Sequence, residues 1–108
     1  MTEVNASPVP ALIHMFIWEK VLIKAYSDGT PSKYYFLRKD GNKLHTVYSH
    51  PEDHSKLVYY VKDCGDSQAA SDLFLAKQKE RLEHNYVIMA GDTTIPDAVT
   101  ETFSFYTA

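Results

Sequence analysis

The sequence predicts a single α+β domain: an antiparallel sheet of about five to six strands, in the order β-β-β-β-α-β-β, with one long helix packed on one face. The chain has 108 residues, which lies within the size range of one domain with its own core. Eight Tyr and five Phe enrich the composition in residues that favour pleated, half-buried surfaces. Residues 67–84 instead combine strong helix formers and contain neither Gly nor Pro, so they predict the helix.

The N-terminal part divides into an arm and an apolar segment. Residues 1–10 are small and polar and are interrupted by two prolines, which predicts a flexible N-terminal arm ahead of a single domain at 11–108. In the apolar segment 11–26, side chains alternate over the second half, and this alternation predicts a strand. The first half, residues 11–18, fits either a strand or a short buried helix, because periodicity does not separate the two.

Residues 33–48 predict a β-hairpin, since two aromatic-rich runs flank the turn residues Asp-Gly-Asn at 40–42. A turn centred on positions 41 and 42 pairs Asp40 with Lys43. A turn centred one residue earlier would place Arg38 opposite Lys43, and like charges in direct opposition destabilise a sheet. We therefore expect the first register, although a three-residue loop also fits the sequence.

This register decides which side chains of the hairpin share a face. The expected cross-strand partners are Tyr35 with Tyr48 and Phe36 with Val47. The pleat then puts Tyr34 and Phe36 on one face and Tyr35 and Leu37 on the other. One of these faces must meet the helix, and we expect the other to be free for a partner.

A polar turn and a strand follow the hairpin. Residues 50–54, His-Pro-Glu-Asp-His, predict a single helical turn, with proline at its first position and acidic side chains near its N-terminus. Residues 56–62 then alternate, with apolar side chains on both faces. A strand of this kind is either covered on both sides or keeps one face for a partner.

The helix at 67–84 is expected to be capped by Asp66 or Ser67 and to end at Asn85. Apolar side chains at helical spacing predict a buried stripe, and charged side chains predict a solvent-facing side. The stripe comprises Phe74, Leu75, Gln78, Leu82 and Tyr86, and the charged side comprises Lys77, Glu80, Arg81 and His84. The elements expected after the helix are a short buried strand at 86–90, a turn at 91–96 and a last alternating strand at 99–106.

Composition and charge exclude several classes of protein. Cys64 is the only cysteine, so an intrachain disulfide is impossible and a reducing, cytoplasmic compartment is expected. The apolar run before Glu19 is too short to span a bilayer, and we expect no membrane partner. The net charge of −3 argues against a dedicated nucleic-acid binder, which carries a basic excess, and against an acidic mimic of DNA.

No motif nominates a catalytic centre. The sequence lacks a Gly-rich phosphate loop, a Gly-x-Ser-x-Gly nucleophile motif and a dinucleotide fingerprint, so we expect a non-enzymatic protein without a cofactor. Cys64 stands near the start of the helix, but Asp63 and Asp66 disfavour its thiolate, and an inert structural thiol explains it better. His50 and His54 would share one face of a helical turn and are weak candidates for a metal site. A polar surface turn explains them better.

Aromatic and basic residues on the strands form the candidate partner-binding set, which comprises Tyr34, Tyr35, Arg38, Lys39, Lys43, Tyr59, Tyr60 and Lys62. Tyr and Arg are enriched at the hot spots of protein interfaces. We therefore expect a protein-interaction module that binds a protein partner through a tyrosine-rich sheet face or a charged helix face. Its expected class is a small accessory or inhibitor protein of the kind that phages and other mobile elements encode.

Two alternatives and one open point accompany this expectation. The first alternative is a single-stranded nucleic-acid-binding protein that uses the aromatic and basic hairpin, because tyrosines stack on bases and cations contact phosphates. The second is a metal-binding protein with a histidine site. Whether the chain forms a homodimer is left open by the sequence.

Overall fold

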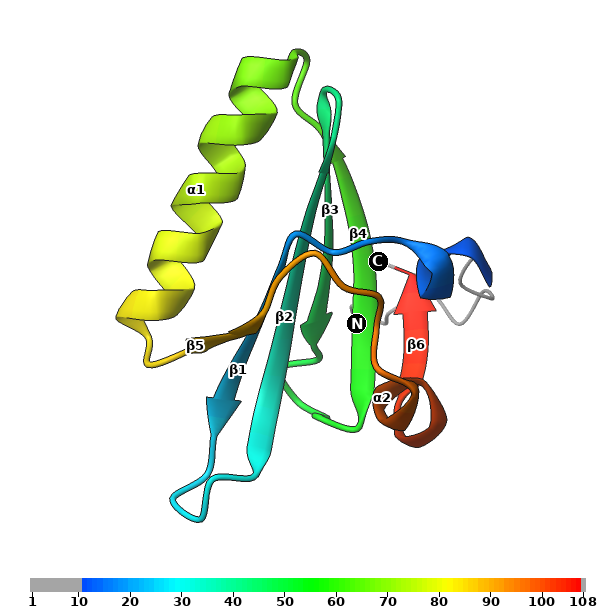
Figure 1. The fold of residues 1–108 in the computed structure, drawn as a ribbon, viewed down its shortest axis with the longest axis vertical. Coiled ribbons are helices and arrows are strands. Elements are labelled where there is room, and N and C mark those ends of the chain that lie inside the picture. The colour runs from blue at the N-terminus through cyan, green and yellow to red at the C-terminus, as the bar shows by residue number, and fades with distance from the viewer. Residues whose placement is uncertain (1–10, 108) are drawn as a thin grey trace.

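The computed structural model describes residues 11–107 and contains one six-stranded sheet with a long helix on one face (Figure 1). Its elements are a 3₁₀ helix η1 (Ala11–Met15), β1 (Lys20–Ala25), β2 (Pro31–Asp40), β3 (Lys43–Ser49), β4 (Lys56–Asp63), α1 (Ser67–Glu83), β5 (Val87–Ala90), α2 (Asp97–Thr102) and β6 (Ser104–Thr107). The strand order is β5-β1-β2-β3-β4-β6. All neighbouring strands are antiparallel except β4 and β6, which are parallel. The expected α+β architecture is confirmed, with one parallel pair that was not predicted. The arm expected at 1–10 lies outside the described residues.

The hairpin of β2 and β3 has the predicted register. Asp40 lies opposite Lys43, and the expected tyrosine and Phe36 pairs are present. Gly41 has a φ of 59°, a left-handed conformation that glycine adopts without a steric penalty. The turn thus favours the register that keeps Arg38 away from Lys43.

The sheet face that carries Tyr34 and Phe36, here called the opposite face, is covered by segments from both ends of the described chain. Its buried cluster comprises Ile13, Trp18, Val21, Phe36, Val47, Leu57, Tyr59, Ile95 and Val99. Phe103 and Phe105 pack against this cluster. In Figure 1, η1 and α2 lie on the side of the sheet away from α1, and β6 continues the sheet beside β4. The expectation that the face away from the helix would be free for a partner is therefore wrong, because the flanking segments fold back over its aromatic side chains.

The face that carries Tyr35 and Leu37, here called the helix face, packs against α1. Its buried cluster comprises Leu22, Tyr35, Leu37, Leu44, Phe74 and Tyr86. The helix begins at the predicted residue and ends at Glu83, one residue before the predicted end. The Asp66 side chain accepts a hydrogen bond from Ala69 N, and Asn85 has a φ of 70° just after the C-cap.

The buried stripe predicted for α1 is wrong in part. Ala70 and Phe74 are the buried residues of the helix, whereas Leu75 and Leu82 are exposed. Lys77 and Arg81, expected to face solvent, are only partly exposed and turn toward the sheet. The long aliphatic stems of lysine and arginine can cover apolar surface while their charged ends stay near water. The helix is therefore rotated about its axis from the orientation that the spacing of its apolar residues predicts.

The helical turn predicted at 50–54 is not formed. The backbone bends there instead, and Asp53 organises the turn: its side chain accepts a hydrogen bond from Ser55 N, and its carbonyl accepts one from Lys56 N. Short polar side chains compete with helical hydrogen bonds in this way. The geometric argument that placed His50 and His54 on one helical face is therefore lost.

Two elements after α1 also differ from the prediction. The strand expected to be buried at 86–90 is the edge strand β5, and its side chains are largely exposed. Residues expected to begin the last strand form the short helix α2, whose first turn follows Pro96; the carbonyl of Pro96 accepts hydrogen bonds from the amides of Val99 and Thr100. None of the helices among residues 11–107 is long and apolar enough to cross a membrane.

Candidate functional site

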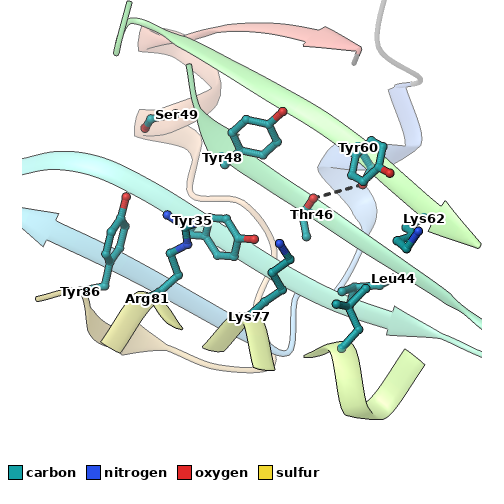
Figure 2. Close-up of a pocket in the computed structure, with 11 residues that line it drawn as sticks. Tyr35, Leu44, Thr46, Tyr48, Ser49, Tyr60, Lys62, Lys77, Arg81 and Tyr86 are labelled. Atoms are coloured by element: carbon teal, nitrogen blue, oxygen red, sulfur yellow. Dashed lines mark hydrogen bonds between the residues drawn. The ribbon is translucent and has the colours of Figure 1, made fainter. Parts of the chain in front are cut away.

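A groove of about 390 Å³ lies between α1 and the strands β2, β3 and β4 (Figure 2). It exists because α1 contacts β2 and β3 and leaves the helix face of β4 open beside it. The groove is lined by Tyr35, Leu44, Thr46, Tyr48, Ser49, Tyr60, Lys62, Leu73, Lys77, Arg81 and Tyr86. Its volume lies at the lower end of the range found for ligand sites.

Four tyrosines are among the residues that line the groove. Tyr35, Tyr48 and Tyr60 come from three adjacent strands, and Figure 2 shows their rings spread along the sheet side of the groove. Thr46, between the last two, donates a hydrogen bond from Oγ1 to the carbonyl of Tyr60 at 3.3 Å. Burial raises the pKa of Tyr35 and of Tyr48, so both phenols stay protonated and neutral at physiological pH. Each can donate a hydrogen bond to an acceptor in the groove.

Three cations line the same groove. Lys77 and Arg81 project from α1 toward the sheet, and Lys62 comes from the exposed end of β4 (Figure 2). The Arg81 guanidinium carbon lies 4.5 Å from the centre of the Tyr35 ring and 5.7 Å from that of Tyr86, distances at which cation–π attraction holds the side chain in place. No Asp or Glu is among the described residues that line the groove. The groove therefore offers positive charge and neutral donors to a ligand.

Arg81 also has an acidic neighbour on the rim. Its Nη2 lies 2.9 Å from Glu80 Oε1, which offsets part of its charge. Its Nε is buried and has no hydrogen-bond partner among the described residues. Lys62 and Lys77, in contrast, form no ion pair within residues 11–107. These two lysines are the unneutralised cations of the groove.

The predicted partner-binding residues do not form one surface. Tyr35, Tyr60 and Lys62 line the groove. Lys77 and Arg81 also line the groove, although the helical pattern predicted them on the solvent-facing side of α1. Their spacing of four, in line with the small residue at position 70 and the aromatic residue at 74, was the signal that could have placed them toward the sheet.

The remaining members of that set lie elsewhere. Lys39 donates a hydrogen bond from Nζ to Ser67 Oγ at 2.9 Å, at the start of α1. Lys43 is exposed at the end of the hairpin. Tyr34, Arg38 and Tyr59 belong to the opposite face, where Tyr34 packs on the core and Tyr59 is part of it. The pleat separates them from the groove, because neighbouring residues of a strand point to opposite sides of the sheet.

Arg38 and Tyr59 take part in a polar cluster around His45 on the opposite face. His45 is buried, and its Nδ1 lies 2.8 Å from Tyr59 Oη. Its Nε2 lies 3.8 Å from Asp40 Oδ2, and the same carboxylate oxygen lies 3.7 Å from Arg38 Nη1. Burial lowers the pKa of His45 from 6.5; the cations of Arg38 and Lys43 act in the same direction, and the Asp40 carboxylate acts against them.

The His45 cluster predicts a pH-dependent stability. Because the folded state disfavours protonation of His45, its contribution to stability is complete above pH 6.5 and is lost as the pH falls through the lowered pKa of the folded state. We expect the free energy of unfolding, measured by urea titration at fixed protein concentration, to decrease between neutral pH and mildly acidic pH. His45→Gln should weaken this dependence, and the exposed-site control His84→Gln should keep it. An equal slope in wild type and His45→Gln would contradict the assignment.

The weak metal candidates His50 and His54 belong to no cluster of metal-ligand side chains among the described residues. His50 Nδ1 accepts a hydrogen bond from Glu52 N at 3.1 Å, within the polar turn itself. Among residues 11–107, no group of three or more His, Cys, Asp or Glu side chains is placed to hold a metal ion. Cys64 packs against the helix-face core, and its Sγ lies 3.7 Å from the carbonyl of Lys62.

Comparisons of the chain with protein-family models, with curated proteins and with solved structures found no match. A functional argument therefore starts from the chemistry of the groove: neutral phenols, unpaired lysines and a stacked arginine on one concave surface.

Proposed function

We propose that the chain is a non-enzymatic protein-interaction module that binds an acidic segment of a partner protein in the groove beside α1. The observation that carries this proposal is the convergence of Lys62, Lys77 and Arg81 on a groove without an acidic lining residue among those described. Carboxylates of a bound segment would meet these cations, and the phenols would donate further hydrogen bonds. Tyr and Arg are also the residue types that dominate binding energy at interfaces.

The distribution of charge favours a short acidic peptide over a long nucleic acid. Single-stranded nucleic acid binds in basic grooves that follow its backbone over several nucleotides. Here only three cations line the groove, the surface of α1 outside it carries exposed Asp72, Glu80 and Glu83 beside the single exposed Lys79, and the whole chain has a net charge of −3. These acidic groups would repel a polyanion that extended beyond the groove.

Single-stranded nucleic acid is the second candidate, and one observation favours it. Tyr60 is 43% exposed and lies on the same face of β4 as Lys62. A base could stack on this ring while a neighbouring phosphate contacts the lysine. An accessory or inhibitor role, an origin in a phage or mobile element, and a cytoplasmic location belong to the proposal as expectations from the sequence.

A selection experiment tests the proposal without knowledge of the partner. Random peptides displayed on phage are selected on the immobilised full-length chain, and single-stranded oligonucleotides of random sequence are titrated in parallel. We expect the selected peptides to be enriched in Asp and Glu and to lose affinity as salt increases, because salt screens exposed charges. Selected peptides without an acidic bias, or binding of the oligonucleotides alone, would overturn the peptide proposal.

A further inference from the structure

The strand β5 is an edge of the sheet that residues 11–107 form. It pairs with β1 on one side, and it is the terminal strand of the six. The backbone amides and carbonyls that point away from β1 form a ready template for another strand. Proteins usually protect such edges with a charged residue or a proline, yet residues 86–91 contain neither.

Large apolar side chains surround this edge. The exposed fractions are 56% for Val87, 46% for Ile88 and 43% for Met89. The helix does not cover them, because α1 packs over β2 and β3. Leu75 and Leu82 on α1 are exposed as well. Three successive exposed apolar side chains on one edge strand favour an interaction site there.

We propose that β5 pairs antiparallel with β5 of a second copy, so that two chains join their sheets edge to edge. A two-fold axis at Ile88 places Ile88 opposite itself and Val87 opposite Met89 of the second copy. Each pair is apolar, and the pairs occupy both faces of the joined sheet. An isologous interface must be self-complementary in this way.

Charge complementarity supports the same partner. His84 precedes β5 and Asp92 follows it, and both side chains are exposed. The two-fold axis brings the end that carries His84 toward the end of the second copy that carries Asp92, so no like charges face each other at these positions. The other edge strand, β6, is a weaker candidate because its apolar side chains are mostly packed against the opposite-face core or the end of β4.

The joined sheet would leave both grooves open, since β2, β3, β4 and α1 supply every lining residue of the groove except Tyr86, which precedes β5. If the proposed groove function also holds, the dimer would present two binding sites and could bind repeated acidic segments with avidity. The dimer itself does not depend on that function, because the following tests measure only the association of the chain with itself.

Sedimentation equilibrium of the full chain over about a hundredfold range of concentration tests the association. We expect wild type to reach twice the chain mass of 12.3 kDa and Ile88→Lys to remain monomeric with an unchanged circular dichroism spectrum. Met15→Lys, which changes an apolar side chain that is 71% exposed in η1, should dimerise like wild type, because His14 of the same helix contacts Phe105 of β6 at the other edge of the sheet. A wild type that stays monomeric, a dimer that persists in Ile88→Lys, or open-ended oligomers would overturn the proposal.

Disulfide trapping tests the register without a destabilising charge. In a Cys64→Ser background, Ile88→Cys should form a covalent dimer under air oxidation, because directly opposite Cα atoms lie about 4.5–5.5 Å apart. Val87→Cys alone should not, since two copies of position 87 would be diagonal neighbours about 7–8 Å apart. A mixture of Val87→Cys and Met89→Cys chains should give the covalent heterodimer. Equal trapping of all three single variants, or none, would contradict this register.

Discussion

Replacing both Lys62 and Lys77 by glutamate is expected to weaken binding of a selected acidic peptide by at least about a hundredfold, which corresponds to about 2.7 kcal/mol. These lysines line the groove and form no ion pair within the described residues, so their charge is available to a ligand. The double substitution changes an attractive site into a repulsive one, and repulsive charge pairs at an interface cost several kcal/mol. Fluorescence anisotropy with a labelled peptide measures the change.

Lys79→Glu is the matched control for this prediction. Lys79 lies on the same helix, is exposed and does not line the groove. The Lys79→Glu substitution reverses one lysine charge on the same helix and leaves every groove-lining residue unchanged. We expect Lys79→Glu to bind the peptide nearly as well as wild type. If charge reversals at Lys79 and at Lys77 weaken binding equally, the groove is not the site and only the overall charge matters.

Phe36→Ala is expected to decrease the free energy of unfolding by about 3–5 kcal/mol, the usual effect of removing a buried aromatic ring. Phe36 is fully buried in the centre of the opposite face. Its ring centre lies 5.8 Å from that of Trp18 and 6.0 Å from that of Tyr34, so the substitution leaves a cavity between two further aromatic rings. Domains of this size are stable by only about 5–15 kcal/mol, and the loss is a large part of that total.

Tyr26→Ala provides the comparison for Phe36→Ala. Tyr26 is 59% exposed, and the hydrogen bonds of its turn are made by its backbone. Its substitution should change the free energy of unfolding by less than about 0.5 kcal/mol. Urea unfolding of wild type, Phe36→Ala and Tyr26→Ala measures both changes in the free energy of unfolding. The protein concentration is held constant because self-association would stabilise the folded state. A loss below about 1 kcal/mol for Phe36→Ala would mean that the opposite-face core is not packed as described.

The candidate site shows where helical pattern analysis fails. The apolar spacing of α1 placed Leu75 and Leu82 in the core and Arg81 in solvent, whereas the structure exposes both leucines and stacks Arg81 on Tyr35. The pattern treats a cation as polar along its whole length. The Arg81 guanidinium instead stacks on tyrosine rings of the sheet through cation–π contacts. The preferred rotation of the helix therefore depends on the side chains of the sheet against which it packs.

Local features of this protein follow from the sequence by itself. The register of the β2–β3 hairpin depends on a short turn and on the pairing of Asp40 with Lys43, and residues close in sequence decide both. The bounds of α1 depend on Asp66 at its start and on the left-handed Asn85 at its end, again within one turn. These elements were predicted correctly because their stabilising contacts are close along the chain.

The tertiary structure alone decided which surfaces are free. Segments around Ile13 and Val99 meet across the opposite face, although they are far apart in the chain, and they bury the aromatic side that was expected to bind a partner. Because α1 packs over β2 and β3, a groove lies between the helix and β4, and α1 does not cover the edge strand β5. Which surfaces stay exposed depends on the total apolar area that segments far apart in the chain bury together, weighed against the conformational entropy that they lose. A local pattern of residues does not determine that balance.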